Sequence, residues 1–379
     1  MRLIRNAGRQ VRFDERRRAM AVTATLGSVL VLWLLSLLWG CASAERFPRG
    51  YNLLSTDLRV WQNPAEGFSL TLVSSPDRAQ GFAEWGRLGI YGRIVGTTKS
   101  GSSMDISLGD GGMNGLALRL EMKGNSIVAR CVAPPEAMAA LGDAAPRATV
   151  TAELMNFPSA LRVSTAKLSE TQGNGRDLSM RLQYLSSRAS EVRTLLDEAL
   201  RRGQAIGQMA AFRRAQQEGS PVVVYDQSAQ RPPLIYEEVQ YPVFVSRRYV
   251  SVATQRYLFN GGAHGAASTD FDVVDLENGA RLGPDELLRE GWREALLPAL
   301  SAELMRQGTY AGLSSEGGLK SLGLFEPALT APDKVFVCMN GLGFEYDRYQ
   351  IAPWAMGEYI VLLPWDQVTA YLKDAIKPF

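Results

Sequence analysis

The sequence holds a single histidine, His264, in the stretch NGGAHG at residues 260–265. Zinc hydrolases usually place at least two imidazoles on the metal, so one histidine excludes that class, and with it the usual metal-dependent carbohydrate deacetylases. There is no G-x-S-x-G nucleophile motif. A serine–histidine–acid triad on His264 stays formally open, but no local spacing favours it. We therefore expect no metal site and no cofactor.

Two carboxylates offer a second kind of chemistry. Glu345 and Asp347 are two residues apart in the predicted strand FEYDRY, so both project from one face. Such a pair can cleave a glycosidic bond, with one carboxyl acting as the acid. The same spacing is typical of a solvent-facing strand edge whose charge Arg348 balances. We favour that second interpretation and keep a glycan hydrolase as the alternative function.

Aromatic residues are frequent near the end of the sequence and could bind a ligand, because aromatic faces stack on sugar rings and anchor protein interfaces. Most should be core residues, but Tyr349 and Trp354 flank a turn at Pro353 and should be partly exposed. Glycines can adopt backbone angles closed to other residues, which permits a sharp turn before His264. A structural role for His264 is favoured over ligand contact. The candidate binding residues are Gly261, Gly262, His264, Tyr349, Pro353 and Trp354.

The first forty-four residues predict the location of the protein. Residues 19–44 carry no charged side chain, and residues 1–18 hold seven arginines. An apolar helix of about 20 residues can cross a membrane, and flanking arginines keep their side in the cytoplasm. Residues 45–379 should therefore lie outside the cytoplasm, in a bacterial periplasm or on the outer face. Three fates are open: lipidation of Cys41 in LWGC, cleavage after Ala44, or an uncleaved membrane anchor.

Charge and cysteine usage agree with that location. The overall charge of +2 depends on the N-terminal arginines, so the rest of the chain is mildly acidic. No nucleic-acid partner is expected, because nucleic-acid binding needs a basic face. Cys131 and Cys338 can form a disulfide in an oxidising compartment or remain two separate buried thiols, and both alternatives stay open.

The pattern along the chain predicts an α+β protein. Short alternating runs between residues 66 and 133, separated by Gly-rich turns, predict an antiparallel β sandwich or barrel, which we assign to residues 45–160. Apolar residues then recur at steps of four and three and predict a long amphipathic helix, capped by Asp177, within a helical connector over residues 165–220. This stripe, over residues 178–199, would support either a homodimer or packing against the protein's own sheet, and we favour packing. Its members are Leu178, Leu182, Leu185, Ala189, Val192, Leu196 and Ala199.

Residues 221–379 should form an α+β unit. Long strands follow residue 234, a helix is predicted over residues 284–307, and a hairpin should turn near Asn340-Gly341. A further strand in GEYIVLLPW and a closing helix in PWDQVTAYLKDAI complete this unit.

Three motifs in this unit resemble the RsiV-type C-terminal domain over residues 235–379. They are a G-G-A-H turn after a strand, a G-x-x-L before a helix, and I-A-P-aromatic-x-x-G before the last strand. Here they fall on Gly261, Gly262, Ala263 and His264, on Gly279 and Leu282, and on Ile351, Ala352, Pro353, Trp354 and Gly357. Two positions depart from the pattern, because Gln350 replaces a common acidic residue and Trp354 replaces the usual tyrosine.

The resemblance implies an α+β binding domain of the cell envelope. The family includes a membrane-anchored anti-sigma factor that binds lysozyme, and envelope proteins with peptidoglycan-deacetylase domains. A cytoplasmic tail of eighteen residues is too short to fold around a sigma factor, so that role is not expected here. The function expected is a membrane-tethered, non-enzymatic binding protein whose ligand is peptidoglycan, another glycan or a lysozyme-like hydrolase. A structural protein that dimerises is a further alternative.

Overall fold

The computed structural model describes residues 52–100, 103–109, 116–132, 148–156, 160–171, 176–201, 232–310 and 317–373. The chain divides into two compact units, Met1–Pro48 and Arg49–Phe379, and every described residue belongs to the second. The predicted tail, the predicted membrane segment and Cys41 lie outside the described residues. Within the described residues, no helix combines the length and apolarity needed to cross a membrane.

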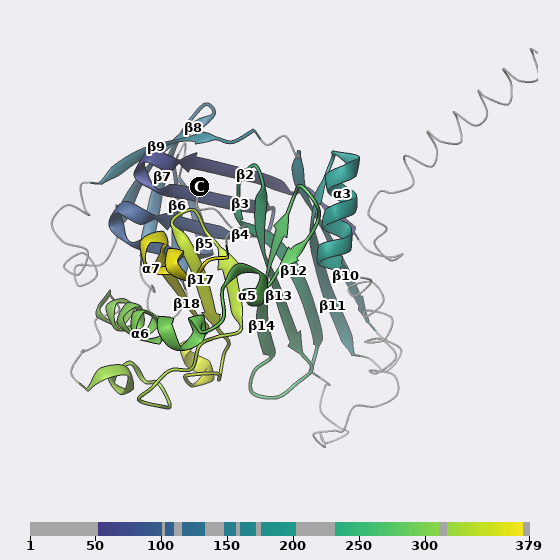
Figure 1. Cartoon of the computed structure of the whole chain (residues 1–379). Coiled ribbons are helices and arrows are strands. Elements are labelled where there is room, and N and C mark those ends of the chain that lie inside the picture. The colour runs from purple at the N-terminus through teal and green to yellow at the C-terminus, as the bar shows by residue number, and fades with distance from the viewer. Residues whose placement is uncertain are drawn as a thin grey trace, which may run out of the picture. The chain divides into compact units, whose positions relative to one another are not determined.

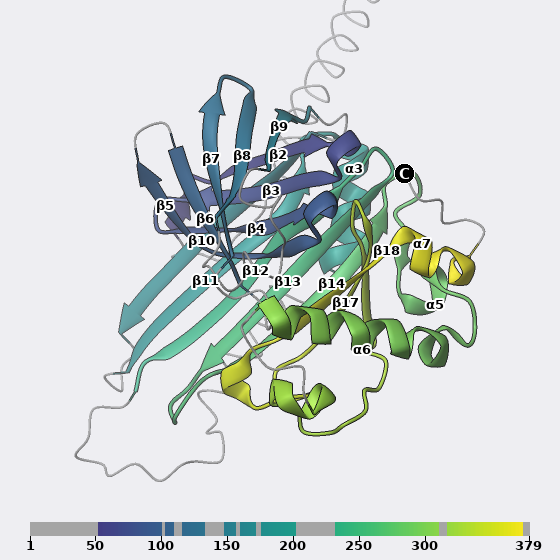
Figure 2. The same ribbon diagram turned by 90° about the vertical axis from the view of Figure 1, so that its left-hand side faces the viewer.

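Eight antiparallel strands form a closed barrel, which confirms the β-rich N-terminal part (Figures 1 and 2). Each strand pairs with the next, and the first closes on the last through Trp61 and Leu154. Large apolar side chains such as Phe68 and Trp85 are buried and pack edge to face, with centroids 5.6 Å apart. The strands are β2 (Asp57–Asn63), β3 (Phe68–Ser75), β4 (Arg78–Trp85), β5 (Ile90–Ser100), β6 (Ser103–Gly109), β7 (Ala117–Lys123), β8 (Ser126–Val132) and β9 (Thr149–Leu154).

A seven-stranded sheet lies beside the barrel, in the order β1-β10-β11-β12-β13-β14-β15. Its neighbouring strands are antiparallel except β11 and β12, which are parallel, so the sheet is mixed. The strands are β1 (Asn52–Leu54), β10 (Leu161–Thr171), β11 (Asp177–Ser187), β12 (Leu234–Val245), β13 (Tyr249–Phe259), β14 (Ala266–Asp275) and β15 (Arg281–Leu282).

The long helix predicted between the two halves of the chain is wrong. Strand β11 takes up residues 177–187, and of the described residues in the predicted connector only 190–201 are helical, as α3 (Ser190–Leu196) and the π-helical turn η5 (Asp197–Arg201). Asp177 lies in the strand and accepts a hydrogen bond from Thr171 instead of capping a helix. The apolar stripe proposed for a dimer is therefore divided between a strand and a short helix, with five of its members buried: Leu178, Leu182, Leu185, Leu196 and Ala199.

The helix prediction failed because β11 is an inner strand of the sheet. Leu178, Met180, Leu182 and Tyr184 are all buried, which is the two-residue period of a strand. Near its end both faces are covered, so Leu185 is buried as well. Because apolar residues lie on both faces of the strand, their spacing in the sequence also fits the three- and four-residue steps of a helix.

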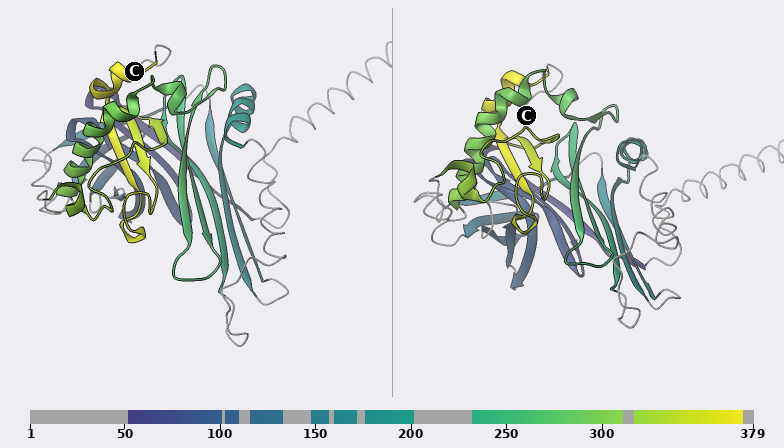
Figure 3. Two further views of the ribbon diagram at one scale, coloured as in Figure 1. Left: turned by 60° about the horizontal axis from the view of Figure 1, so that its bottom comes forward. Right: turned by 90° about the horizontal axis from the view of Figure 1, so that it is seen from below.

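The described residues after β15 form a three-stranded antiparallel sheet with helices. Its strands are β16 (Lys334–Val337), β17 (Gly341–Tyr346) and β18 (Tyr359–Pro364), with β17 in the centre. The predicted helix is divided into α5 (Pro284–Leu287) and α6 (Trp292–Tyr310), and α6 lies along β18 (Figure 3). Short helical segments complete this part: η6 (Gly318–Leu322), η7 (Trp354–Met356), α7 (Trp365–Val368) and η8 (Thr369–Tyr371).

The hairpin predicted near Asn340-Gly341 is confirmed, and it shows why a glycine is needed there. A Cβ atom on Gly341 would lie 1.9 Å from the carbonyl oxygen of Leu363 on β18. The close approach of the two backbones therefore excludes any side chain at this position.

Phe336 joins the barrel and the two sheets in one core. It stacks on Phe271 of β14, with centroids 4.0 Å apart, and meets Phe82 of the barrel edge to face at 6.2 Å. Polar contacts reinforce the junction, because the Thr71 hydroxyl donates to the Pro242 carbonyl at 2.6 Å. Barrel and sheets therefore share a continuous core, which fixes the loops described next.

Candidate functional site

The turn between β13 and β14 carries His264. Gly261 and Gly262 have φ angles of +114° and +102°, which favour glycine, as the sequence predicted for a sharp turn here. Gly265 lies against the ring of Tyr257, where a Cβ atom would be 2.6 Å from the ring carbons. His264 itself is exposed. The turn therefore holds the imidazole at the surface, on a backbone that packs against an aromatic ring.

His264 meets two aromatic residues from the loop between β17 and β18. Its ring stacks on Trp354, with centroids 4.4 Å apart and planes 19° apart. The Tyr349 hydroxyl lies 3.3 Å from Nε2, and Nδ1 lies 3.2 Å from the carbonyl oxygen of Gly265. Because a carbonyl only accepts, the neutral ring carries its proton on Nδ1 and accepts from Tyr349 at Nε2. We call His264, Tyr349 and Trp354 the aromatic surface.

Tyr349 is held in an uncommon conformation. Its φ is +65° and it is 55% exposed. A left-handed backbone costs roughly 1–2 kcal/mol for a residue with a Cβ atom, and such strain is concentrated at functional sites. Two hydrogen bonds between Asp347 and Gln350 enclose the turn, one from each backbone N–H. Gln350, which departs from the family pattern, thus fixes the position of Tyr349.

Trp354 is flanked by a cation. The Arg348 guanidinium carbon lies 4.7 Å from the centroid of the Trp354 ring, and Arg348 Nη1 donates to the Trp354 carbonyl. Pro353 directly precedes the short helix η7 and is exposed. The structure thus brings His264, Tyr349 and Trp354 together. Gly261 and Gly262 shape the turn that presents His264.

The carboxylate pair has a different environment from the one expected. Strand β17 is central, and Glu345 is fully buried, so the solvent-facing edge favoured from the sequence is wrong. Lys334, and not Arg348, is the close cation: its Nζ lies 3.3 Å from Glu345 Oε2 and 2.5 Å from Asp347 Oδ2. Burial raises the pKa of Glu345 well above its ordinary value, which the charge of Lys334 partly offsets. Because Glu345 is buried, its carboxyl group cannot contact a sugar ring, so this geometry does not favour a hydrolase.

Next to this pair lies a buried ion pair between the barrel and β18. Arg93 of β5 contacts Glu358, which directly precedes β18, at 2.5 Å, and the two side chains are 6% and 3% exposed. Thr269 of β14 donates to Glu358 at 2.9 Å and accepts from Arg93 at 2.8 Å. Burial alone would raise the pKa of Glu358, but the charge and hydrogen bond of Arg93 hold it below the usual value. The contacts join the barrel to both sheets.

Cys131 and Cys338 are separate buried thiols, one of the two alternatives left open by the sequence. Cys131 lies in β8 of the barrel and Cys338 follows β16. Burial raises the pKa of the Cys131 thiol to about 11 and that of Cys338 well above its ordinary value. Both thiols are therefore protonated and unreactive near neutral pH.

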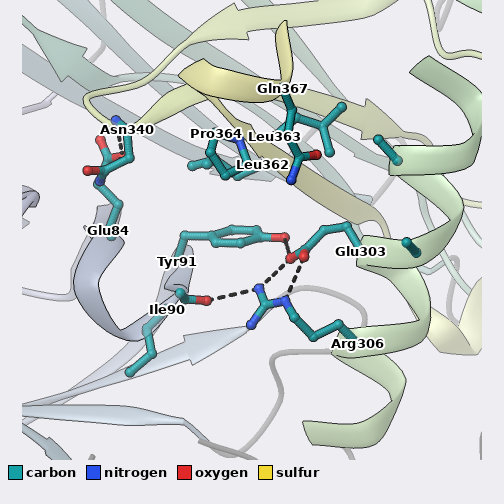
Figure 4. Close-up of a pocket in the computed structure, with 14 residues that line it drawn as sticks. Glu84, Ile90, Tyr91, Glu303, Arg306, Asn340, Leu362, Leu363, Pro364 and Gln367 are labelled. Carbon is teal, nitrogen blue, oxygen red and sulfur yellow. Dashed lines mark hydrogen bonds and ion pairs between the residues drawn. The ribbon is translucent and has the colours of Figure 1, made fainter. Parts of the chain in front are cut away.

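Sequence reasoning missed a cavity of about 560 Å³ between the barrel, α6 and β18. Its polar residues include Glu84 and Tyr91 from the barrel and Glu303 and Arg306 from α6 (Figure 4). The i, i+3 spacing of Glu303 and Arg306 indicates a surface ion pair on a helix. Nothing in the sequence connects that pair with residues more than two hundred positions earlier.

Among the described residues, no group of three or more histidine, cysteine, aspartate and glutamate side chains is placed to hold a metal ion. The fold and the aromatic surface together define an α+β protein in which a closed barrel supports a domain with exposed aromatic residues on its loops. Residues 285–366 match the family described as "Protein of unknown function (DUF3298)", and the chain carries a DUF3298 domain there. This confirms the family resemblance expected from the sequence.

Two solved structures are similar to this chain. A DUF3298 family member from Bacteroides fragilis NCTC 9343 is 17% identical, with a TM-score of 0.45, and the match covers 58% of this chain and 96% of that one. A DUF3298 family protein from Pseudomonas aeruginosa PAO1 is also 17% identical, with a TM-score of 0.42, covering 57% of this chain and 98% of that one. No curated protein matches the sequence.

Proposed function

We propose that this chain is a non-enzymatic, membrane-tethered binding protein of the bacterial cell envelope, and that its ligand contacts the aromatic surface. The observation that carries the proposal is the convergence of His264, Tyr349 and Trp354 from two loops eighty-five residues apart, with Tyr349 strained and exposed. Exposed aromatic rings on loops over a rigid core are typical of binding sites. The apolar run at residues 19–44 and its arginines support the location.

The ligand that this surface fits best is a glycan strand, with peptidoglycan as the envelope example. Sugar rings present C–H faces that pack on aromatic rings, and hydroxyl groups can exchange hydrogen bonds with a tyrosine hydroxyl. Arg348 beside Trp354 adds a cation for the acidic groups of such a polymer. The resemblance to a lysozyme-binding family makes a lysozyme-like hydrolase the second ligand to test.

The test is co-sedimentation of the full chain, in detergent, with purified cell-wall sacculi. We expect Trp354→Ala and Tyr349→Ala each to weaken binding by about two- to tenfold, because one stacked ring contributes roughly 0.5–1.5 kcal/mol. Val95→Ala, at an apolar residue of the barrel that is 63% exposed, is the matched control and should bind like the parent. A parallel pull-down with lysozyme separates the two ligands. The proposal fails if neither ligand binds or if the two aromatic variants behave like the control.

A hydrolase is the alternative that the geometry disfavours. Its own test is direct, because a double change of Glu345→Gln and Asp347→Asn should abolish any wall-cleaving activity if this pair is catalytic. We expect no such activity in the parent chain.

A further inference from the structure

The cavity beside α6 shares no residue with the aromatic surface. Its walls are largely apolar, and Ala299 and Ala302 of α6 face Ile90 of the barrel and Leu362 and Leu363 of β18 across it. The small alanine side chains leave the space open. A volume of about 560 Å³ lies within the range of small-molecule sites. The size and lining therefore suit a compact organic molecule with an apolar body.

One end of the cavity is electrically neutral. Arg306 pairs with both carboxylate oxygens of Glu303, and its Nη2 also donates to the Gly89 carbonyl at 3.0 Å. Tyr91 donates to Glu303 at 2.5 Å and accepts from Gln307. Figure 4 shows the Tyr91 side chain extending from the barrel to this pair. Because Arg306 and Glu303 cancel each other, this end holds no spare positive charge for an anion.

The other end carries an acid without a cation. Glu84 is 1% exposed and accepts three hydrogen bonds, from the backbone N–H groups of Met339 and Asn340 and from the Asn340 amide. An ionised carboxylate has about four acceptor positions, so one remains. Among the residues lining the cavity, Arg306 is the one cation, and Glu303 already pairs with it. Burial raises the pKa of Glu84 to about 7, against the lowering by its donors, so it is ionised at pH 8.

We propose that this cavity binds a small organic cation, a protonated amine on an apolar body. The ammonium group compensates Glu84, and the ring of Tyr91, which lines the same cavity, can add a cation–π interaction. The apolar body packs between the α6 alanines and Leu362 and Leu363. An anion of the same shape would be repelled by Glu84, and a neutral molecule would leave the charge of Glu84 buried without compensation.

The test uses three probes of similar shape: 2-phenylethylamine, 2-phenylethanol and 3-phenylpropionate. Each is titrated into the full chain in detergent at pH 8 by calorimetry, with the heat of mixing into empty micelles subtracted. We expect the amine to bind at least tenfold more tightly than the alcohol, and the carboxylate to bind more weakly than both. The proposal is overturned if the amine does not bind, or if the three probes bind equally.

Two matched variants on α6 locate the binding site. Ala302→Phe fills the cavity from an exposed helix position and should weaken amine binding at least tenfold. Ala295→Phe makes the same change at an exposed position outside the lining and should leave binding unchanged. Equal affinities in the two variants would overturn the assignment. Sedimentation of Ala302→Phe with sacculi should match the parent, so the outcome is independent of the function proposed for the aromatic surface.

Discussion

The buried ion pair between Arg93 and Glu358 gives the sharpest stability prediction. Glu358→Gln removes the negative charge that lies 2.5 Å from the Arg93 guanidinium, and the Arg93 side chain is 6% exposed. Unit charges about 4 Å apart interact by roughly 4 kcal/mol at an effective dielectric constant of about 20, and breaking a buried pair costs about 3–5 kcal/mol. The new amide oxygen can still accept from Thr269. We therefore expect the free energy of unfolding to fall by about 3 kcal/mol.

The pH dependence of this loss has a defined sign. The folded-state pKa of Glu358 lies below its ordinary value of 4.5, so its contribution to stability is present above pH 4.5 and is lost as pH falls through the folded-state pKa. The difference in the free energy of unfolding between the parent and Glu358→Gln should therefore be largest at pH 7 and should decrease below pH 4.5. Urea unfolding followed by tryptophan fluorescence measures both.

An exposed pair in the barrel is the matched control. Arg119 and Asp105 form two hydrogen bonds, but their side chains are 51% and 40% exposed. Asp105→Asn should cost less than about 1 kcal/mol, because solvent screens an exposed pair. If Glu358→Gln costs no more than Asp105→Asn, the two buried charges are not coupled and the reasoning is refuted. The double change of Arg93→Met and Glu358→Leu should recover most of the loss.

Three further predictions concern buried groups. Burial raises the pKa of Glu84 to about 7, so the folded chain binds more protons than the unfolded chain between pH 4.5 and 7, and stability should fall by up to about 3 kcal/mol as pH rises through that window. Glu84→Gln should flatten this slope in urea midpoints at pH 5 and pH 8. Gly343→Ala would place a Cβ atom 2.2 Å from the Phe336 ring and should cost about 1–3 kcal/mol by calorimetry, whereas Gly92→Ala, with 3.6 Å to its nearest neighbour, should cost less. Peptide mapping after alkylation should find Cys131 and Cys338 unlabelled in the native chain and both labelled in urea without reductant, an outcome that a disulfide would prevent.

The barrel and the C-terminal hairpin could be predicted because local patterns determine them. Apolar residues alternate along the barrel strands between Gly-rich turns, and Asn340-Gly341 marks a turn wherever the chain folds. The predicted helix over residues 284–307 is divided at Leu288 and Gly291, where Gly291 adopts a φ of +82°. A glycine inside a helical pattern indicated that break.

Other features depend on packing that no local pattern contains. Residues 177–187 fit both periods because β11 is covered on both faces from Met180 onward, so the choice between strand and helix required the neighbouring strands. An alternating pattern around Glu345 is the same for an edge strand and a central one, and only the sheet order shows that the carboxyl is sealed. The cavity combines residues from three separate parts of the chain, so its charge balance appears only after folding.

The aromatic surface and the buried ion pair are connected through Arg348. Its guanidinium lies over Trp354, while its Nε is 3.5 Å from the second carboxylate oxygen of Glu358. Thr269 orients that carboxylate from β14, so Thr269→Val keeps the side-chain shape but removes a hydrogen bond that positions Glu358. We expect this buried change to weaken sedimentation with sacculi severalfold while the chain stays folded, because Arg348 and Trp354 lose their fixed geometry. Ser251→Ala removes another buried hydroxyl of the same sheet, which donates to the Val337 carbonyl and not to Glu358, and it should not weaken binding. Equal binding by Thr269→Val and the parent would show that the loop holds Trp354 without help from β14 of the seven-stranded sheet.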